Sequence, residues 1–312
     1  MITVQCEAQV EALHHWEMSL VYALQQWGRP GWDSFFIFLN YFDTVFFVFL
    51  LVPILWYGYH WKSGMRVFSI LALNSYVNFL FKVFFHQPRP LMVDPSVGVM
   101  KATTGGFPSG AAQTVILLSG ILVCSWRSWW AWCFAAVYIF FISVSRVYLG
   151  MHYPTDLVGG WAIGLGMVGI YYYVFPEIER LLKRWSFLQK AIFVAAVPVV
   201  MLIVYQSLST YLLAMSMAGG GIGALAASYC EVIEDSRTWQ QRIVRPLVAI
   251  GGIFVIYALF VSWYGPGANK SYLSGGALMM ISLWTTLGAS SLFYLLPARY
   301  VHTHLRHRTE SK

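Results

Sequence analysis

One short stretch of the sequence concentrates side chains that can carry out chemistry. Between Ser145 and Asp156 it places Arg146, His152 and Asp156 between two long apolar runs. Charged groups at membrane depth are costly unless they are paired or functional. A neutral histidine is a nucleophile, and a carboxylate bonded to its second ring nitrogen orients the ring and fixes its tautomer. The spacing therefore predicts a nucleophilic His152 oriented by Asp156; a structural histidine beside a helix-capping Asp156 is the alternative.

Two earlier segments carry groups that bind anions. Lys82 lies near the end of an apolar run, and Arg89 follows seven residues later. Arginine matches phosphate oxygens with paired N–H groups and lysine adds a point charge, although Lys82 alone is also explained by extension to the membrane surface. Further on, Ser109 and Gly110 open another apolar run, where a helix start with free N–H groups is expected to bind an anion. Simple capping by Ser109 is the alternative there.

The elements that hold these segments are predicted to be membrane helices. The chain has 312 residues, 58% of them hydrophobic and 11% charged, and its mean hydropathy is +0.61. Soluble domains carry roughly 25% charged residues. We therefore expect an all-α polytopic membrane protein, without nucleic-acid binding despite its net charge of +7. The four cysteines have no paired spacing, so neither a disulfide framework nor a metal site is predicted.

Nine apolar runs are long enough to cross the roughly 30 Å hydrocarbon core of a membrane. The predicted spans are residues 44–60, 66–86, 110–126, 128–146, 156–175, 190–208, 210–228, 247–264 and 276–297. The seventh span is the least secure of the nine. Its glycines at 219–221 and 223 permit either close helix packing or a re-entrant turn.

The segment before these spans, residues 1–43, is expected to begin with a helix. Apolar residues recur there at helical spacing, at Val10, Leu13, Trp16, Leu20, Leu24 and Trp27. Glu7, Glu11 and Glu17 interrupt the segment, so a signal peptide is not predicted. An amphipathic helix at the membrane interface and a plainly packed helix both fit the pattern. No chemistry is assigned to it.

The positions of the 20 lysines and arginines predict the orientation of the chain. With nine spans, one side of the membrane receives 14 of them, at positions 62, 66, 127, 180, 183, 184, 190, 237, 242, 245, 299, 306, 308 and 312. The other side receives the remaining six, at positions 29, 82, 89, 101, 146 and 270. Cytoplasmic loops carry the excess of cations. The three anion-binding segments are therefore predicted to face the periplasm, the exterior or an organelle lumen, and the C-terminus the cytoplasm.

Taken together, the three segments carry a resemblance to a known family. Their order resembles the three-part signature of the type 2 phosphatidic acid phosphatase superfamily. In this chain the three parts are Lys82…Arg89-Pro90, Pro108-Ser109-Gly110 and Ser145-Arg146…His152…Asp156. The resemblance covers roughly residues 44–208 and implies a six-helix core. It implies phosphoryl transfer without a metal or cofactor, in which His152 forms a phosphohistidine and Asp156 orients its ring. It also implies that Lys82, Arg89, Ser109, Gly110 and Arg146 hold the phosphoryl oxygens.

One position departs from that signature. The family's second motif ends in a histidine thought to protonate the leaving oxygen, and Ala111 stands there in this chain. The substitution is either engineered or natural. If it is natural, the substrate class is expected to be one whose leaving group needs no proton. Lipid diphosphates such as isoprenyl diphosphates release a phosphate monoester, which is stable near neutral pH, whereas an alkoxide needs an acid.

The expected organisation is thus an N-terminal segment (1–43), the phosphatase core (44–208), about three additional membrane helices (209–298) and a basic cytoplasmic tail (299–312). The expected function is hydrolysis of a lipid phosphate or isoprenyl diphosphate drawn from the membrane. Two alternatives stay open. One is a catalytically silent protein that binds or moves lipid phosphates, which Ala111 favours; the other is a sugar-phosphate phosphatase of the glucose-6-phosphatase type, to which the helix count is similar. A vanadate cofactor, bound by mostly soluble relatives, is not expected.

Overall fold

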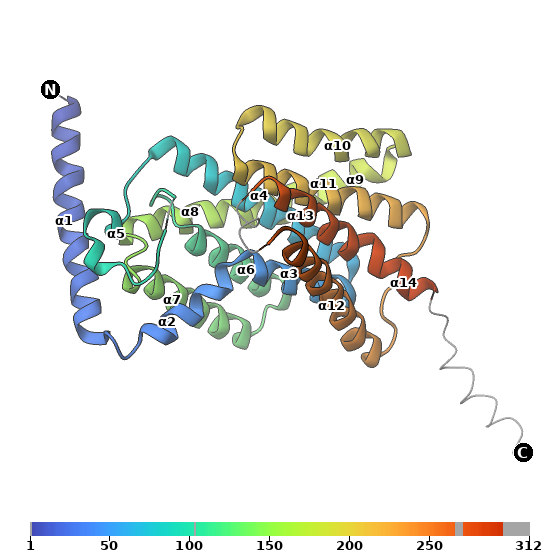
Figure 1. Cartoon of the computed structure of the whole chain (residues 1–312), viewed down its shortest axis with the longest axis horizontal. Coiled ribbons are helices and arrows are strands. Elements are labelled where there is room, and N and C mark those ends of the chain that lie inside the picture. The colour runs from blue at the N-terminus through green and yellow to red at the C-terminus, as the bar shows by residue number, and fades with distance from the viewer. Residues whose placement is uncertain (1, 103, 266–270, 296–312) are drawn as a thin grey trace, which may run out of the picture. The chain divides into compact units, whose positions relative to one another are not determined.

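The computed structural model describes residues 2–102, 104–265 and 271–295, without the side chains of residues 2–14, 43 and 45. Every regular element within these ranges is a helix, which confirms the predicted all-α fold (Figure 1). The helices are α1 (Ile2–Gly28), α2 (Asp33–Asn40), α3 (Val45–Pro53), α4 (Trp61–Phe85), α5 (Pro90–Val93), α6 (Gly110–Trp126), α7 (Trp129–Tyr148), α8 (Pro154–Gly169), α9 (Phe175–Arg184), α10 (Phe187–Val204), α11 (Leu208–Tyr229), α12 (Trp239–Tyr264), α13 (Leu273–Leu283) and α14 (Ala289–Leu295). Short 3₁₀ or π-helical turns lie at Tyr41–Asp43, Ile54–Tyr59, Pro95–Val97, Ile170–Val174 and Trp284–Gly288.

The long apolar helices match the predicted membrane spans. Seven helical stretches of the described chain are long and apolar enough to cross a membrane: Trp61–Val93, Trp129–Tyr148, Pro154–Arg184, Phe187–Val204, Leu208–Tyr229, Trp239–Tyr264 and Leu273–Leu295. Two shorter apolar helices, Phe46–Tyr59 and Gly110–Trp126, coincide with the first and third predicted spans. The protein is therefore an all-α polytopic membrane protein. The predicted tail, residues 299–312, lies outside the described residues.

Contacts divide the chain into two compact units. The first consists of Met1–Val48 and Ile70–Arg180, and the second of Phe49–Ser69 and Leu181–Lys312. The boundaries fall inside α3, α4 and α9, and the C-terminal part of α4 belongs to the first unit. Every residue predicted to take part in the site lies in the first unit.

In the first unit, α6 packs against both α7 and α8. Two glycines of α8, four residues apart, allow the approach to α6. A Cβ atom on Gly160 would lie 2.5 Å from the carbonyl oxygen of Ser109, and one on Gly164 would lie 2.6 Å from that of Gln113. Small residues at this spacing let helix backbones meet closely in membrane proteins. The approach brings the starts of α6 and α8 together, and both starts carry predicted site residues.

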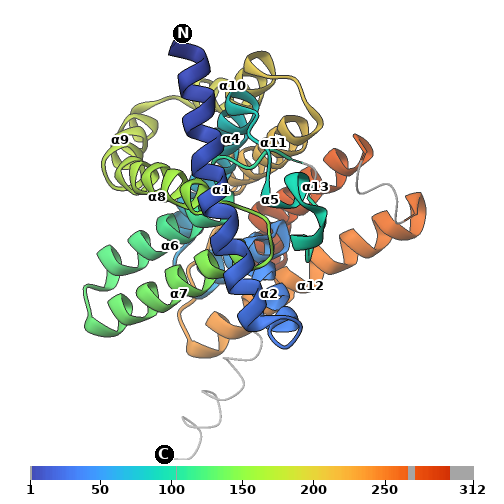
Figure 2. The ribbon, with the colours of Figure 1, turned by 90° about the vertical axis from the view of Figure 1, so that its left-hand side faces the viewer.

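The N-terminal helix α1 also belongs to the first unit, where it lies across the ends of α7 and α8 (Figures 1 and 2). The helix predicted from residue spacing is confirmed, and three side chains of its apolar stripe face outward. Trp16, Leu20 and Trp27 are exposed, whereas Met18 and Val21 belong to the core. An exposed apolar stripe on a surface helix is consistent with contact with lipid.

In the second unit, the glycines of α11 have a packing role. The helix is continuous from Leu208 to Tyr229, so the seventh predicted span contains no re-entrant turn. A Cβ atom on Gly219 would collide with the backbone of Met279 in α13, and one on Gly223 with Thr286 in the following π-helical turn. Of the two alternatives left open by the sequence, the structure shows close helix packing.

Candidate active site

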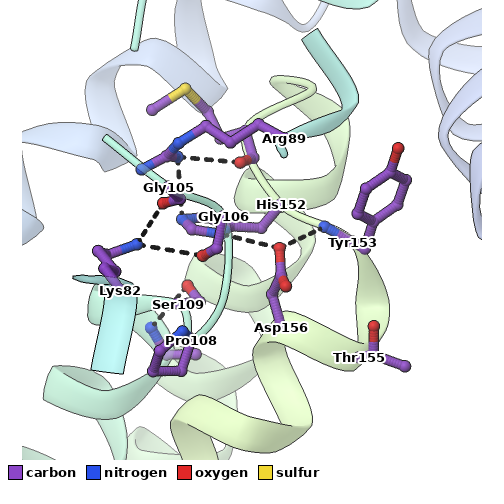
Figure 3. A network of polar contacts seen from close by, with 12 residues as sticks. Lys82, Arg89, Gly105, Gly106, Pro108, Ser109, His152, Tyr153, Thr155 and Asp156 are labelled. Atoms are coloured by element: carbon purple, nitrogen blue, oxygen red, sulfur yellow. Dashed lines mark hydrogen bonds and ion pairs between the residues drawn. The ribbon is translucent and has the colours of Figure 1, made fainter. Parts of the chain in front are cut away.

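Side chains of the three predicted segments lie close together within the first unit (Figure 3). The side chains come from separate places in the fold: Lys82 from the last turn of α4, Arg89 from the residue before α5, Ser109 from the N-cap of α6, Arg146 from the last turn of α7, His152 from the loop between α7 and α8, and Asp156 from the first turn of α8. Polar contacts link four of them: His152 to Asp156 and to Arg89, and Asp156 to Ser109. Lys82 bonds to carbonyl oxygens of the loop before α6. The sequence therefore identified residues that lie close together in the structure.

His152 and Asp156 form a buried pair. Nδ1 of His152 lies 3.2 Å from Oδ2 of Asp156, and the two side chains are only 5% and 1% exposed. The same carboxylate oxygen accepts a hydrogen bond from the N–H of Tyr153, at 3.0 Å. The carbonyl oxygen of Arg146 accepts from the backbone N–H of His152, so the end of α7 holds the loop that presents the ring. The geometry is that of a histidine oriented by a carboxylate.

Arg89 determines which nitrogen of His152 carries the proton. Its Nη1 atom lies 3.1 Å from Nε2 of the ring. Arginine has only donors, so Nε2 accepts, and the neutral ring carries its proton on Nδ1, where it donates to Asp156. Nε2 is thus the basic nitrogen, and it faces the cations of the site.

The rest of the Arg89 guanidinium is held by backbone and hydroxyl oxygens. Nε donates to the carbonyl oxygen of Thr104 at 2.7 Å, Nη2 to the Thr104 hydroxyl at 2.9 Å, and Nη1 to the carbonyl oxygen of Met151 at 2.9 Å. Lys82 is held in a similar way, because its Nζ donates to the carbonyl oxygens of Gly105 and Gly106, at 2.7 and 3.1 Å. Both cations therefore point into the loop that precedes α6, and extension of Lys82 to the membrane surface is not needed to explain its position.

The charge on the site favours a neutral His152. Burial, followed by the positive charges of Arg89, Lys82 and Arg146, lowers the pKa of the His152 imidazole well below its ordinary value. A lowered pKa keeps the ring unprotonated at neutral and mildly acidic pH. The ring is therefore in the protonation state that a nucleophile requires.

Ser109 and Ala111 lie at the start of α6. The Oγ atom of Ser109 accepts from the N–H of Ala112 at 3.4 Å, which is the capping role, and its own N–H donates to the carbonyl oxygen of Asp156 at 2.9 Å. Ala111 is buried among Val115 and Ile142. Partly buried apolar residues packed against this cluster are Leu39, Phe42, Ile116, Tyr138 and Ile139. The position at which the family carries a histidine is thus enclosed by apolar side chains.

Two supporting side chains were missed by the sequence analysis. Asn40, the last residue of α2, accepts a hydrogen bond from Nη1 of Arg146 through Oδ1, at 2.6 Å. Asn78 of α4 donates to the carbonyl oxygen of Pro108 at 3.2 Å and to Gln113 at 2.9 Å, which holds the turn before α6. Asn78 lies four residues before Lys82 and so on the same helix face, a spacing from which its place near the site could have been predicted. No such spacing relates Asn40 to a predicted site residue.

No group of three or more histidine, cysteine, aspartate or glutamate side chains in the described part of the chain is arranged to hold a metal ion. The site presents the side chains of Lys82 and Arg89 and the imidazole of His152, which contacts Arg89. The arginine and lysine donors match the oxygens of a phosphoryl group.

A helical membrane fold with converging Lys-Arg, Ser-Gly and Arg-His-Asp segments defines a class of phosphoryl-handling membrane protein, and comparison with known proteins agrees. Residues 63–180 match the model of the PAP2 superfamily. The chain is 31% identical over 176 residues to a lipid A 4'-phosphatase of Bacteroides thetaiotaomicron, an alignment covering 49% of this chain and 74% of that protein. The chain belongs to the PAP2 superfamily, which confirms the predicted resemblance.

Two further relatives show the spread of similar proteins. Lipid phosphate phosphatase delta of Arabidopsis thaliana is 26% identical over 178 residues, which is 51% of this chain and 42% of the plant protein. An undecaprenyl-diphosphatase of Sulfolobus acidocaldarius is 27% identical over 105 residues, which is 33% of this chain and 50% of the archaeal protein. Similarity thus extends to proteins named as lipid phosphatases and to one named as a diphosphatase.

Proposed function

We propose that this protein is an integral-membrane phosphatase that hydrolyses a lipid phosphate or an isoprenyl diphosphate through a phosphohistidine on His152. The observation that carries the proposal is the state of His152. Its Nδ1 is held by Asp156, and its basic Nε2 faces Arg89. The relatives named above, which are lipid phosphatases and a lipid diphosphatase by name, support the substrate class.

In the resting site, Arg89 donates to the nitrogen that would attack. A phosphoryl group that enters must therefore draw the Arg89 donor onto its own oxygens, which releases the Nε2 lone pair at the moment when the substrate is bound. Lys82 and Arg146 add positive charge around the same group. These cations stabilise the charge that spreads over the phosphoryl oxygens in the transition state.

The reaction then follows from the arrangement of the pair. Nε2 of His152 forms a bond to phosphorus while the bond from phosphorus to the leaving oxygen breaks, and the leaving group departs with the electron pair. Asp156 stabilises the positive charge on the phosphorylated imidazole through the Nδ1 proton. Water next attacks phosphorus and the N–P bond breaks. Inorganic phosphate leaves, and the neutral imidazole ring is restored.

The surroundings of Ala111 bear on the leaving group. A proton donor is worth roughly 10²–10⁴-fold for a poor leaving group. Ala111 supplies none and packs against apolar side chains. We therefore expect diphosphates, which release a phosphate monoester that needs no proton, to be turned over in preference to monoesters, which release an alkoxide.

The Ala111→His substitution tests this preference. We expect the variant to gain turnover of lipid monophosphates by roughly 10²-fold or more, with much less gain on isoprenyl diphosphates, because only the alkoxide needs the proton. Phosphate release from both classes is the measurement, with thermal stability in detergent as the check on folding in the apolar cluster. An equal gain on both substrates would refute the leaving-group argument.

The same assay separates the main alternative. A silent lipid-binding protein, the hypothesis that Ala111 favours, predicts no phosphate release from the natural chain on any substrate, and none from Ala111→His. Release by Ala111→His alone would identify a silenced enzyme. Release of phosphate from glucose 6-phosphate in preference to all lipids would favour the sugar-phosphatase alternative.

We also propose that the site faces the non-cytoplasmic side of the membrane, on the strength of the lysine and arginine distribution. In a background with the native cysteines replaced by serine, a cysteine introduced by Lys101→Cys, in the exposed loop between α5 and α6, should react with a membrane-impermeant maleimide on intact cells. Lys183→Cys, on the exposed surface of α9, is the matched control and should react only after permeabilisation. The reverse pattern would place the site in the cytoplasm.

A further inference from the structure

The buried carboxylate of Glu17 in α1 has no part in the steps above. Its side chain is 0% exposed, and Oε1 accepts a hydrogen bond from the backbone N–H of Thr155 at 2.6 Å. Oε2 is also buried and has no hydrogen-bond partner among the described residues. Burial of a carboxylate is costly unless hydrogen bonds or ion pairs compensate for the lost hydration. The position of its partner, Thr155, indicates the role of this carboxylate.

Thr155 is the second residue of α8, and Asp156 is the third. The first N–H groups of a helix have no partner within it and carry partial positive charge. Pro154, the first residue, has no N–H, so the N–H of Thr155 is the first that the helix start presents. Glu17 satisfies this donor from a different helix. The turn of α8 that presents Asp156 to His152 is therefore held from outside by α1.

Other contacts of α1 reach different parts of the first unit. The hydroxyl of Tyr22 donates to Oδ2 of Asp94 at 2.6 Å. Nε2 of Gln25 donates to the carbonyl oxygens of Val97 and Tyr148, at 2.8 and 2.6 Å. These bonds attach α1 to the loop after α5 and to the end of α7. Neither side chain hydrogen-bonds to α8, so the effects of Glu17 and of general α1 attachment are separable.

We infer that Glu17 is a positioning residue for the proposed phosphatase reaction, acting through the first turn of α8 to fix the Asp156 carboxylate against Nδ1 of His152. The inference rests on the proposed function. Glu17 bonds to a backbone N–H and not to the cations that hold the phosphoryl group. Its loss therefore lowers kcat and leaves KM close to that of the natural chain. Misplacement of a catalytic group by about 1 Å costs on the order of 10²-fold.

Two substitutions separate the contact from the charge. Glu17→Gln keeps an oxygen at the same reach for the Thr155 N–H but removes the charge. Glu17→Asp keeps the charge but is one methylene shorter, so it withdraws the oxygen from that N–H. In full-length protein in lipid bilayers, we expect Glu17→Gln to keep kcat within about threefold and Glu17→Asp to lower it by about tenfold or more, with KM changed less than about twofold in both. Tyr22→Phe, the matched control, removes a different α1 hydrogen bond and should leave kcat unchanged.

Three outcomes would overturn the inference: Glu17→Asp more active than Glu17→Gln, both variants as active as the natural chain, or Tyr22→Phe as damaging as Glu17→Asp. The ¹H–¹⁵N NMR signal of the His152 Nδ1 proton, assigned by its loss in His152→Ala, gives a readout independent of turnover. It should keep its position in Glu17→Gln and shift in Glu17→Asp. If the natural chain releases no phosphate, the proposed function fails, and this signal still decides the role of Glu17.

Discussion

His152→Ala is expected to reduce phosphate release from a lipid phosphate or diphosphate by at least about 10⁴-fold, because loss of a nucleophile removes the covalent route entirely. Substrate binding should persist, since Lys82, Arg89 and Arg146 remain. The measurement is steady-state phosphate release by purified protein, together with binding of the substrate to the variant. Thermal stability is the check on folding, because the substitution removes the Nδ1–H donor from the buried Asp156 carboxylate.

His86→Ala provides the matched control for that experiment. His86 lies three residues before Arg89 in the same loop, but its side chain is exposed. We expect this variant to keep kcat within about threefold, as surface substitutions away from a site usually do. Equal losses in the two variants would contradict the assignment of His152 as nucleophile.

Asp156→Asn is expected to lower kcat by roughly 10³–10⁴-fold with little change in KM, as removal of the charge from a histidine-orienting carboxylate does in other enzymes. One carboxylate oxygen, Oδ2, serves both the Tyr153 N–H and Nδ1 of His152, so an amide oxygen in that place keeps both contacts. The substitution therefore removes the negative charge that would stabilise a positively charged phosphohistidine, while the hydrogen bonds that orient the ring can persist.

Asp94→Asn is the control for that substitution. Asp94 also caps a short helical turn, by accepting from the N–H of Ser96 at 2.9 Å, but it lies outside the proposed site. It should keep kcat within about threefold. An Asp156→Asn variant with kcat within tenfold of the natural chain would show that the carboxylate orients a structural histidine and not a nucleophile.

The helices of this fold were accessible from the sequence because the bilayer imposes long apolar runs on any chain that crosses it. Each of the nine predicted runs overlaps an apolar helix in the described chain, although some ends differ, as where the run predicted from residue 247 begins at Trp239. The division into two units could not be predicted from the sequence. Its boundaries fall within α3, α4 and α9, and none of these helices is interrupted at the boundary.

The candidate site residues could be predicted from the sequence for a different reason. Costly charges at the ends of apolar runs stand out against a chain with few charges, so Lys82, Arg146, His152 and Asp156 were visible in advance. The contact between Arg89 and Nε2 of His152 was not, because it depends on the path of the loop that supplies the carbonyl oxygens of Thr104 and Met151. Loop paths of this kind leave no periodic pattern.

Glu17 shows what the sequence pattern left open. The apolar stripe of α1, which includes Trp16, Leu20 and Trp27, fitted both a helix at the membrane interface and a plainly packed helix, and Glu17 was seen only as an interruption of the segment. In the structure these apolar side chains are exposed, and Glu17 is buried. In a membrane protein an apolar stripe on a helix can pack against the protein core or contact lipid, so the stripe alone does not identify the buried face.

Covalent phosphorylation of His152 is tested by an alkali quench during turnover of a lipid diphosphate whose terminal phosphoryl group carries ³²P. We expect protein-bound label that is stable in alkali, is lost in acid, maps to the peptide containing His152 and is missing in His152→Ala. Label on a different residue, or equal labelling of His152→Ala, would contradict it.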